Sequence, residues 1–346
     1  MVAEAGTITH GEILQQPEIW PDTVRRVRAA KITSVADPVL TGAGTSAYAA
    51  MAIESAWPGA LAVPSTELLL DFPRFVRPGG TVISLARSGD SPESVAVVQK
   101  IRRALPTVRH IAVTANPKGK LAGWEGVEPI LLDPRTNDRS LVMTSSFTNL
   151  VTGGLALARP DEIEAALPAL CEGWDKRFEQ HEAKARAIAQ NPPARAMVLA
   201  SLPLYGAARE ACLKMLESTA GQVAAISETY LGLRHGPMSY VQPDSIVLCF
   251  LSSDPARRRY EVDLAKELRS KKLGRLIAVG NGDPEVFHEV VTTGASGLPD
   301  HLRTPAEIIF PQLLAFHLSL RLGLDPDNPS PGGVINRVVQ GVVIYD

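Results

Sequence analysis

Short apolar runs alternate with longer stretches of helical periodicity along most of this chain. In the first half, five apolar runs predict strands, at residues 38–44, 61–65, 81–86, 110–115 and 128–133. Apolar residues recur every three or four positions in three other segments, which predicts helices at 45–57, 91–105 and 143–158. Alternating strands and helices are typical of a parallel sheet covered by helices on both faces.

The second half of the chain repeats this pattern. Five further apolar runs predict strands, at residues 195–201, 223–227, 245–252, 275–280 and 289–293. Helices are predicted near 206–220, 255–272 and 305–322. The repetition resembles an internal duplication at the level of the fold. We therefore predict an α/β protein with two domains, each built on its own parallel sheet with helices on both faces.

A charged helical segment separates the two halves and ends at Pro192 and Pro193, which cannot continue a helix. We place the boundary between the domains there. The tail is rich in Pro and Gly and then apolar, so we expect it to pack back over the body of the protein. The predicted organisation is a helical segment at 1–35, a first domain at 36–160, a helical linker at 161–193, a second domain at 194–325 and the tail at 326–346.

The composition is that of a globular chain, with 346 residues, 45% of them hydrophobic and 21% charged, and a formal net charge of −2. So small a charge gives no basic field that would attract nucleic acid. No apolar run approaches the roughly 20 residues that span a bilayer, and the start of the sequence lacks the pattern of a signal peptide. We expect a cytoplasmic protein without nucleic-acid or membrane partners.

The three cysteines, Cys171, Cys212 and Cys249, are odd in number and far apart. Neither a disulfide framework nor a close-spaced zinc site is indicated by this arrangement. We expect them to be buried as small hydrophobic side chains and to hold no metal.

A glycine-rich turn, "TGAGTSA", follows the first predicted strand and leads into a helix. Such a turn offers backbone N–H groups and a partial positive charge to an anion, and Thr45 and Ser46 add hydroxyl donors. A dinucleotide fingerprint would need a third glycine and an acidic residue after the next strand, and neither is in place. An ordinary turn with a Thr/Ser helix cap is the other interpretation.

A second hydroxyl-rich loop, "SLARSGDSPES", follows the third predicted strand. Ser88 and Ser91 stand there at the start of a helix, and ligands of doubly wound sheets bind outside the carboxyl ends of the strands. The two loops could therefore meet at one phosphate. Pro92 and Glu93 also form an ordinary helix start, which is the structural alternative.

Several motifs in the same order resemble the sugar isomerase (SIS) domain family. "GAGTSA", "SLARSGDSPESV" and "MTSSFTNL" are similar to a first SIS domain, and "EACLKMLESTAG" with "ETYLGLRHGPMSYV" to a second. The resemblance covers roughly residues 8–345. It is closest to galactosamine-6-phosphate deaminase and tagatose-6-phosphate ketose/aldose isomerase, and more distant to the isomerase half of glucosamine-6-phosphate synthase. It implies two flavodoxin-like domains.

The resemblance implies that the first domain binds a phosphosugar. Its phosphate-binding residues are Thr45, Ser46, Ser88 and Ser91, with Gly44 allowing close approach, and Thr144 and Ser145 would line the sugar. Arg87 stands where the synthase pattern has Gln, which adds a positive charge near the phosphate or the substrate hydroxyls. The closest group also carries Arg, so this is a feature of the subgroup.

Three charged residues of the second domain share one helical face. Glu210, Lys214 and Glu217 lie at i, i+4 and i+7, a spacing that most often gives a solvated salt-bridge stripe. Apolar neighbours favour burial of these charges instead. The resemblance makes Glu217 the proton shuttle and Lys214 a substrate-binding residue. It also makes His235, in "RHGP", the residue that opens the hexose ring, although a lone His is commonly structural.

The expected reaction needs neither metal nor cofactor. His235 would move a proton from the C1 hydroxyl to the ring oxygen, and Glu217 would then carry the C2 proton to C1 through an enediol or enolamine. With an amine at C2, water would hydrolyse the resulting ketimine to a ketose 6-phosphate and ammonia. In relatives the His loop can reach a neighbouring subunit, so we expect a homo-oligomer, a dimer or tetramer, with a shared active site.

Other functions remain open from the sequence. The tail contains no lysine for the Schiff base of the synthase, and no glutaminase domain is found, so amination is not expected. A deglycase of fructosamine-type phosphates, a plain sugar-phosphate isomerase and a non-catalytic phosphosugar sensor are the alternatives. A sensor would need the phosphate loops but not Glu217 and His235. The sequence does not fix galacto against gluco at C4.

Overall fold

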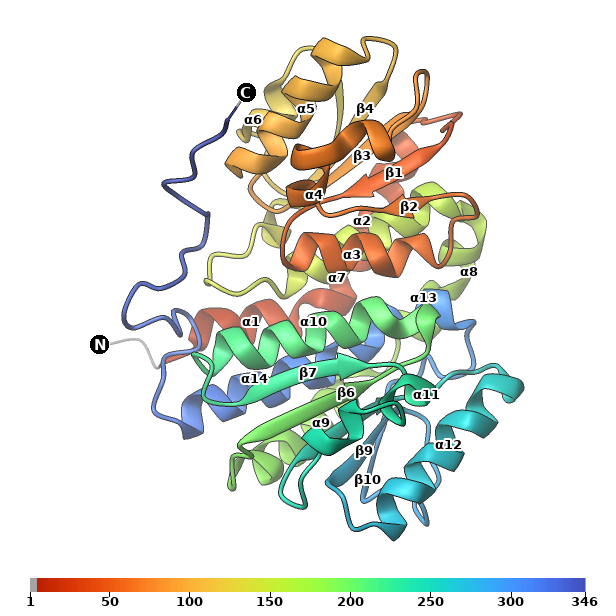
Figure 1. Cartoon of the computed structure of the whole chain (residues 1–346), viewed down its shortest axis with the longest axis vertical. Helices are drawn as coiled ribbons and strands as arrows, with labels where there is room; N and C mark the ends of the chain where they lie inside the picture. The colour runs from red at the N-terminus through yellow and green to blue at the C-terminus, as the bar shows by residue number, and fades with distance from the viewer. Residues whose placement is uncertain (1–4, 346) are drawn as a thin grey trace.

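Two parallel five-stranded sheets form the body of the protein in the computed structural model, which describes residues 5–345 (Figure 1). The first sheet has the strand order β2-β1-β3-β4-β5 and the second the order β7-β6-β8-β9-β10. The strands of the first sheet are β1 (Pro38–Thr41), β2 (Leu61–Ala62), β3 (Thr81–Ala86), β4 (Arg109–Thr114) and β5 (Val127–Leu131). Those of the second are β6 (Arg195–Leu199), β7 (Ala224–Glu228), β8 (Ile246–Phe250), β9 (Arg275–Gly280) and β10 (Glu289–Thr292).

Both sheets have the flavodoxin-like order, in which the first strand lies between the second and the third. Every strand pair is parallel, which confirms the predicted α/β class and its repetition in the two halves. The central strands β3 and β8 are buried along their whole length, as expected when helices cover both faces.

Fourteen α-helices connect or follow these strands in residues 5–345. Those of the first half are α1 (Thr7–Leu14), α2 (Gln16–Ala29), α3 (Thr45–Glu54), α4 (Ser65–Asp71), α5 (Pro92–Ala104), α6 (Lys120–Gly123) and α7 (Ser145–Ala158). The others are α8 (Pro160–Cys171), α9 (Trp174–Ala189), α10 (Leu202–Ser218), α11 (Tyr230–Leu233), α12 (Pro255–Ser270), α13 (Asp300–Glu307) and α14 (Ile309–Arg321). Short 3-10 helices lie at Phe72–Arg74, Pro134–Thr136 and Pro237–Tyr240.

The helix predicted at 305–322 is two helices, and this part of the prediction was wrong. α13 begins at Asp300 and ends at Glu307, and α14 begins at Ile309. Pro311 explains the break, because its ring excludes the carbonyl of residue i−4, which is Glu307. The segment predicted as a linker forms α8 and α9, with Gly173 between them at a positive φ of 70°. Residues 1–4 of the predicted N-terminal segment and residue 346 of the predicted tail lie outside the described residues.

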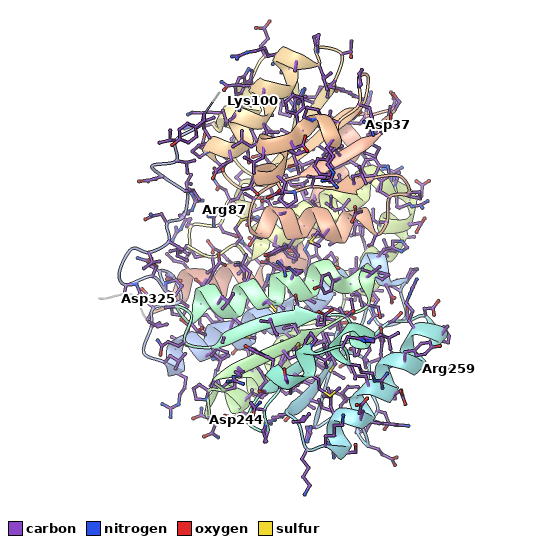
Figure 2. All side chains as sticks on the ribbon, viewed as in Figure 1. Asp37, Arg87, Lys100, Asp244, Arg259 and Asp325 are labelled. Atoms are coloured by element: carbon purple, nitrogen blue, oxygen red, sulfur yellow. The ribbon has the colours of Figure 1, made fainter. Side chains whose placement is uncertain are left out.

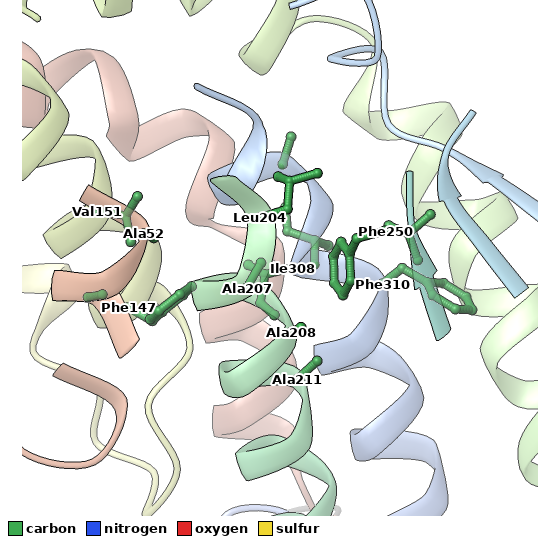
Figure 3. Close-up of a cluster of buried hydrophobic side chains, with 14 of the residues drawn as sticks. Ala52, Phe147, Val151, Leu204, Ala207, Ala208, Ala211, Phe250, Ile308 and Phe310 are labelled. Carbon is green, nitrogen blue, oxygen red and sulfur yellow. The ribbon is translucent and has the colours of Figure 1, made fainter. Parts of the chain in front are cut away.

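Helices of both halves meet between the two sheets, where α3 and α10 run side by side in opposite directions (Figure 1). Figure 3 shows the buried cluster at this contact, with Ala52 and Phe147 from the first half and Ala207 and Ala211 from α10. The apolar core is therefore continuous from one sheet to the other. The small side chains of α10 let the helices approach closely.

After α14 the chain continues without helix or strand to residue 345 and runs along one side of the molecule past both halves (Figure 1). The backbone N–H of Leu141 donates to the carbonyl of Asp327, and Lys100 donates to the carbonyl of Tyr345. Within residues 5–345, every helix is too short or too polar to span a lipid bilayer.

The closest approach of α3 and α10 leads to a stability prediction. A Cβ added at Gly206 would lie 2.5 Å from the backbone nitrogen of Ala52. Gly206→Ala should therefore force the helices apart and lower the free energy of unfolding by about 1–3 kcal/mol, measured by urea denaturation.

Gly11→Ala is the matched control, because Gly11 lies within α1 and an added Cβ there meets no atom within 4 Å. This variant should be as stable as the wild type or more stable, by up to about 1 kcal/mol. Equal stability of the two variants would show that the contact between α3 and α10 tolerates a wider spacing.

Candidate active site

A cavity of about 370 Å³ opens at the carboxyl edge of the first sheet. The loops that follow β1 and β3 form one side of it, the last turn of α10 contributes a carboxylate, and residues 334–340 of the tail lie across it. Seven of the residues singled out from the sequence line this cavity together: Gly44, Thr45, Ser46, Arg87, Ser88, Ser91 and Glu217.

Gly44 shapes the first loop. Its φ of 56° and ψ of −127° form a backbone conformation that residues with a side chain rarely adopt, and it precedes the first turn of α3. Steric crowding does not require glycine at this position, since an added Cβ would meet no atom within 4 Å. Thr45 and Ser46 follow at the helix N-terminus and are both buried. Hydroxyls and N–H groups at such an end suit an oxyanion.

In the second loop the hydroxyls are held by short-range contacts. The N–H of Asp90 donates to Ser88 Oγ at 3.2 Å, and Ser91 Oγ donates to Glu93 Oε2 at 2.9 Å. Pro92 begins α5, in agreement with the predicted helix start. The loop is therefore both a helix start and a part of the cavity wall.

Arg87 is buried against backbone carbonyls. One nitrogen of its guanidinium donates to the carbonyls of Ser140 and Leu141, at 3.2 and 3.1 Å, and another to the carbonyl of Arg337 at 2.6 Å. Burial lowers the pKa of Arg87 to about 10, so the group stays charged at neutral pH. Its contacts hold the tail to the cavity rather than leaving the charge free for phosphate.

Arg337 completes this attachment from the side of the tail. Its guanidinium donates to the carbonyl of Asp138 at 2.9 Å and to Asn137 Oδ1 at 2.7 Å. Figure 2 shows Arg87 on the side of the molecule along which the tail runs. The reciprocal contacts of the two arginines keep Asn336 and Gln340 in the cavity wall.

The three charged residues of α10 do not form a solvated stripe. Lys214 and Glu210 are 1% and 0% exposed, and only Glu217, 23% exposed, reaches the cavity. The Lys214 ammonium lies 2.5 Å from Glu217 Oε2 and 3.3 Å from Glu210 Oε1. It also donates to Thr45 Oγ1 at 3.3 Å, which joins the second domain to the first loop.

The protonation of this group follows from burial. Burial raises the pKa of Glu210 from 4.5 to about 8, against the opposing effect of Lys214, so Glu210 is neutral at pH 7. Burial also opposes the charge on Lys214, but the two carboxyl groups outweigh it and raise the pKa of the ammonium. Lys214 thus keeps its charge between the two carboxyl groups, and its contact with Glu217 Oε2 holds that side chain at the cavity.

Thr144 and Ser145, expected to line the sugar, do not line this cavity. Both are buried, and the Thr144 N–H donates to Asp138 Oδ2 at 2.8 Å, while the Ser145 hydroxyl binds the same carboxylate. Asp138 thereby satisfies the N-terminus of α7, a role that requires these residues to face inward. Met143 lines the cavity in their place.

Two other expected site residues also lie outside the cavity wall. Lys214 lies beneath Glu217 and affects the cavity only through its contact with that side chain. His235 is exposed, on the turn between α11 and the short helix Pro237–Tyr240, and does not line this cavity. The structure of one chain therefore brings Glu217 but not His235 to the two hydroxyl-rich loops.

Sequence reasoning missed Asp138, Asn336 and Gln340. Asp138 gave no local signal, since it lies in an irregular segment, and the tail residues reach the cavity only through contacts made hundreds of residues away in sequence. Among residues 5–345, no cluster of three or more His, Cys, Asp or Glu side chains could hold a metal ion.

No family model matches the chain, but whole-chain relatives exist. D-galactosamine-6-phosphate deaminase AgaS from Shewanella sp. (strain ANA-3) is 36% identical over 97% of this chain and 91% of its own length. The structure of tagatose-6-phosphate ketose/aldose isomerase from Escherichia coli is 29% identical, covers 99% of this chain and 97% of its own, and superposes with a TM-score of 0.87.

A third similarity concerns the fold alone. The C-terminal domain of glucosamine-fructose-6-phosphate aminotransferase from Francisella tularensis covers 91% of this chain and 96% of its own, with a TM-score of 0.74 at 16% identity. The paired parallel sheets found here are thus shared with a more distant protein.

The neutral state of Glu210 can be tested through the pH dependence of stability. A carboxyl whose pKa is raised to about 8 in the folded protein keeps its proton there, while the unfolded chain releases it above about pH 4.5. Its contribution to stability is therefore complete at low pH and is lost as the pH rises toward 8. Glu210→Gln cannot ionise, so its free energy of unfolding should fall less steeply over this range, by up to about 1.4 kcal/mol per pH unit.

Urea denaturation from about pH 5 to about pH 8.5 measures this difference. Glu125→Gln is the control, because Glu125 is exposed and its replacement should leave the wild-type pH profile unchanged. Parallel profiles for the wild type and Glu210→Gln would mean that Glu210 is ionised in the folded protein.

Proposed function

The chain belongs to the AgaS family of D-galactosamine-6-phosphate deaminases, and on this premise we propose that it converts D-galactosamine 6-phosphate to tagatose 6-phosphate and ammonia. The chemistry is that of a sugar-phosphate aldose–ketose isomerase, carried out on a substrate with an amine at C2.

One observation carries the proposal: the Glu217 carboxylate faces the same cavity as the two hydroxyl-rich loops. A phosphate on Thr45, Ser46, Ser88 and Ser91 would place the sugar carbons toward α10, where Glu217 is fixed by Lys214 at 2.5 Å. A protein that only senses phosphosugars has no use for a base held in this way. The arrangement favours an enzyme.

The reaction then runs on the residues of this chain. Once the ring is open, Glu217 removes the C2 proton, the electrons form a C1–C2 double bond, and the former aldehyde oxygen takes a proton from solvent, which gives an enolamine. Glu217 returns its proton to C1 and the nitrogen releases a proton to solvent, which leaves a ketimine at C2. Water adds to the C2 carbon, ammonia leaves, and the ketose 6-phosphate is formed. Lys214 supports both transfers because its charge keeps the carboxylate in one orientation.

Ring opening needs an acid–base group besides Glu217, and among residues 5–345 no His, Asp or second Glu lines the cavity. We assign it to His235 of a second copy, so that a dimer is the smallest active unit. The exposed position of His235 and three exposed apolar side chains of the same domain, Leu216, Ile226 and Leu231, support this assignment. The neighbouring copy would cover these side chains and insert the loop.

An ammonia-release assay tests the activity. Purified protein should release ammonia from galactosamine 6-phosphate, and the rate on glucosamine 6-phosphate, measured in parallel, determines the preference at C4. Glu217→Gln should lower the rate by about 10²- to 10⁴-fold, since it removes the proton carrier. Glu125→Gln is an exposed control and should have the wild-type rate. No ammonia from either sugar would contradict the proposal and leave simple isomerisation or deglycation.

The shared site is tested by mixing two inactive variants. Glu217→Gln and His235→Ala, co-expressed in equal amounts, form mixed dimers in which one of the two sites has both residues intact. Recovery of about one quarter of the wild-type activity is expected from random pairing. No recovery, with mixed dimers verified by differently tagged chains, would place His235 in the site of its own chain.

A further inference from the structure

The second sheet has a counterpart of the candidate active site at its own carboxyl edge. Because α3 and α10 are antiparallel, the start of α3 and the end of α10 meet at the first site, while the start of α10 and the end of α3 meet at the second (Figure 1). A cavity of about 370 Å³ lies there, lined by Ser55 after α3, Pro203 at the start of α10, and Ser253, Arg257 and Asp300.

A similar Ser-x-Asp segment stands at both sites. Ser88-Gly89-Asp90 follows β3, Ser252-Ser253-Asp254 follows β8, and a helix with an early Pro comes next in each case. In the first turn the Asp90 N–H donates to Ser88 Oγ at 3.2 Å, and in the second the Asp254 N–H donates to Ser252 Oγ at 3.0 Å. One hydrogen bond of the first loop is therefore repeated in the second half, although the central residue has a positive φ of 69° in the first turn (Gly89) and a negative φ in the second (Ser253).

The difference lies in what the second turn binds. The hydroxyl of Ser252 donates to Asp300 Oδ2 at 2.5 Å, and the N–H and hydroxyl of Ser253 donate to Asp300 Oδ1 at 2.6 and 2.9 Å. Asp300 is the first residue of α13 and is buried. One carboxylate thus receives three hydrogen bonds at a place where the first domain has an open cavity.

A second carboxylate, that of Glu261, accepts hydrogen bonds from Ser252 and Ser201. Glu261 of α12 is buried and accepts the N–H of Ser252 at 2.7 Å, and the Ser201 hydroxyl donates to its other oxygen. Ser201 belongs to the loop after β6, the counterpart of the loop that carries Thr45. Two internal carboxylates therefore occupy the donors of both loops.

Positive charge also converges on Asp300. Arg303 donates to Asp300 Oδ1 at 3.0 Å and is fully buried, and the Arg257 guanidinium lies 3.6 Å from Oδ2. Burial would raise the pKa of Asp300, but its hydrogen bonds to Ser252 and Ser253 and the charge of Arg303 outweigh burial and hold it below the ordinary value. Two hydroxyls, a backbone N–H and two guanidinium groups form a donor set that suits a tetrahedral oxyanion.

We infer that the carboxyl edge of the second sheet is an oxyanion site that the chain fills with its own Asp300, so that each chain offers one phosphosugar site and not two. The chemical class that the site would take is phosphate or sulfate, and Asp300 stands in for it. Replacing Asp300 by a residue without the carboxylate opens the second site.

Calorimetric titration with inorganic phosphate, in phosphate-free buffer at constant ionic strength, tests this inference. Asp300→Ala should bind one phosphate per chain more than the wild type does, whatever number the wild type binds. Adding Ser253→Ala to this variant removes one hydroxyl donor and should weaken the extra site about tenfold. An unchanged stoichiometry in Asp300→Ala would overturn the inference, as would an extra site that Ser253→Ala does not affect.

Asp300→Ala leaves Arg303 without one of its buried partners, so a second variant covers the case in which it does not fold. Asp300→Ser shortens the side chain, removes its charge and keeps one hydroxyl that can accept a hydrogen bond from Arg303. Phosphate should raise the melting temperature of Asp300→Ser more than that of the wild type, and chloride at the same ionic strength should not. Equal responses of the two proteins to phosphate would overturn the inference. Because Asp300 lies outside the proposed catalytic site, these outcomes do not depend on whether the chain deaminates a phosphosugar.

Discussion

The close packing of α3 against α10 is the constraint on which the rest of this structure depends. Gly206 lets the two backbones approach, and the buried ammonium of Lys214 then lies within reach of Thr45 on one helix and Glu217 on the other. A buried charge is tolerated only where its partners are in place, so the pairing fixes the relative position of the helices as well as their contact. The glycine-rich loop before α3 and the Glu217 side chain come from different halves of the chain, and this contact sets the distance between them.

Burial also gives two chemically similar side chains of α10 different properties. Glu210 and Glu217 are both carboxyl groups on one helix face, but the first is fully buried, which raises its pKa to about 8, while the second reaches the cavity beside Lys214. Lys214 lies within 3.3 Å of both. The orientation of the carboxyl group that faces the cavity thus depends on a lysine that does not line the cavity itself.

The sequence was sufficient for features that are encoded locally. The periodicity predicted both sheets, and the helix-start signals at Thr45 and Pro92 predicted the two loops of the cavity. Side-chain contacts could not be predicted from it. Arg87 binds the backbone carbonyl of Arg337 in the tail, a contact between segments 250 residues apart. Thr144 and Ser145 face Asp138 instead of the cavity, because this carboxylate accepts hydrogen bonds from the start of α7. His235 also lies away from the cavity. The break before α14 was a local signal, Pro311, that the apolar pattern concealed.

The two Ser-x-Asp turns show why a local motif cannot by itself specify a binding site. In each turn the N–H of the Asp donates to the Oγ of the Ser two residues before it. What separates them is Asp300, 48 residues after Ser252, which supplies the anion that the second turn requires. An oxyanion loop has donors that must be satisfied in either case, by a ligand or by the chain. A duplicated fold can therefore lose one of its two ligand sites through a single carboxylate and keep the loop, since the carboxylate satisfies the same donors that the ligand would.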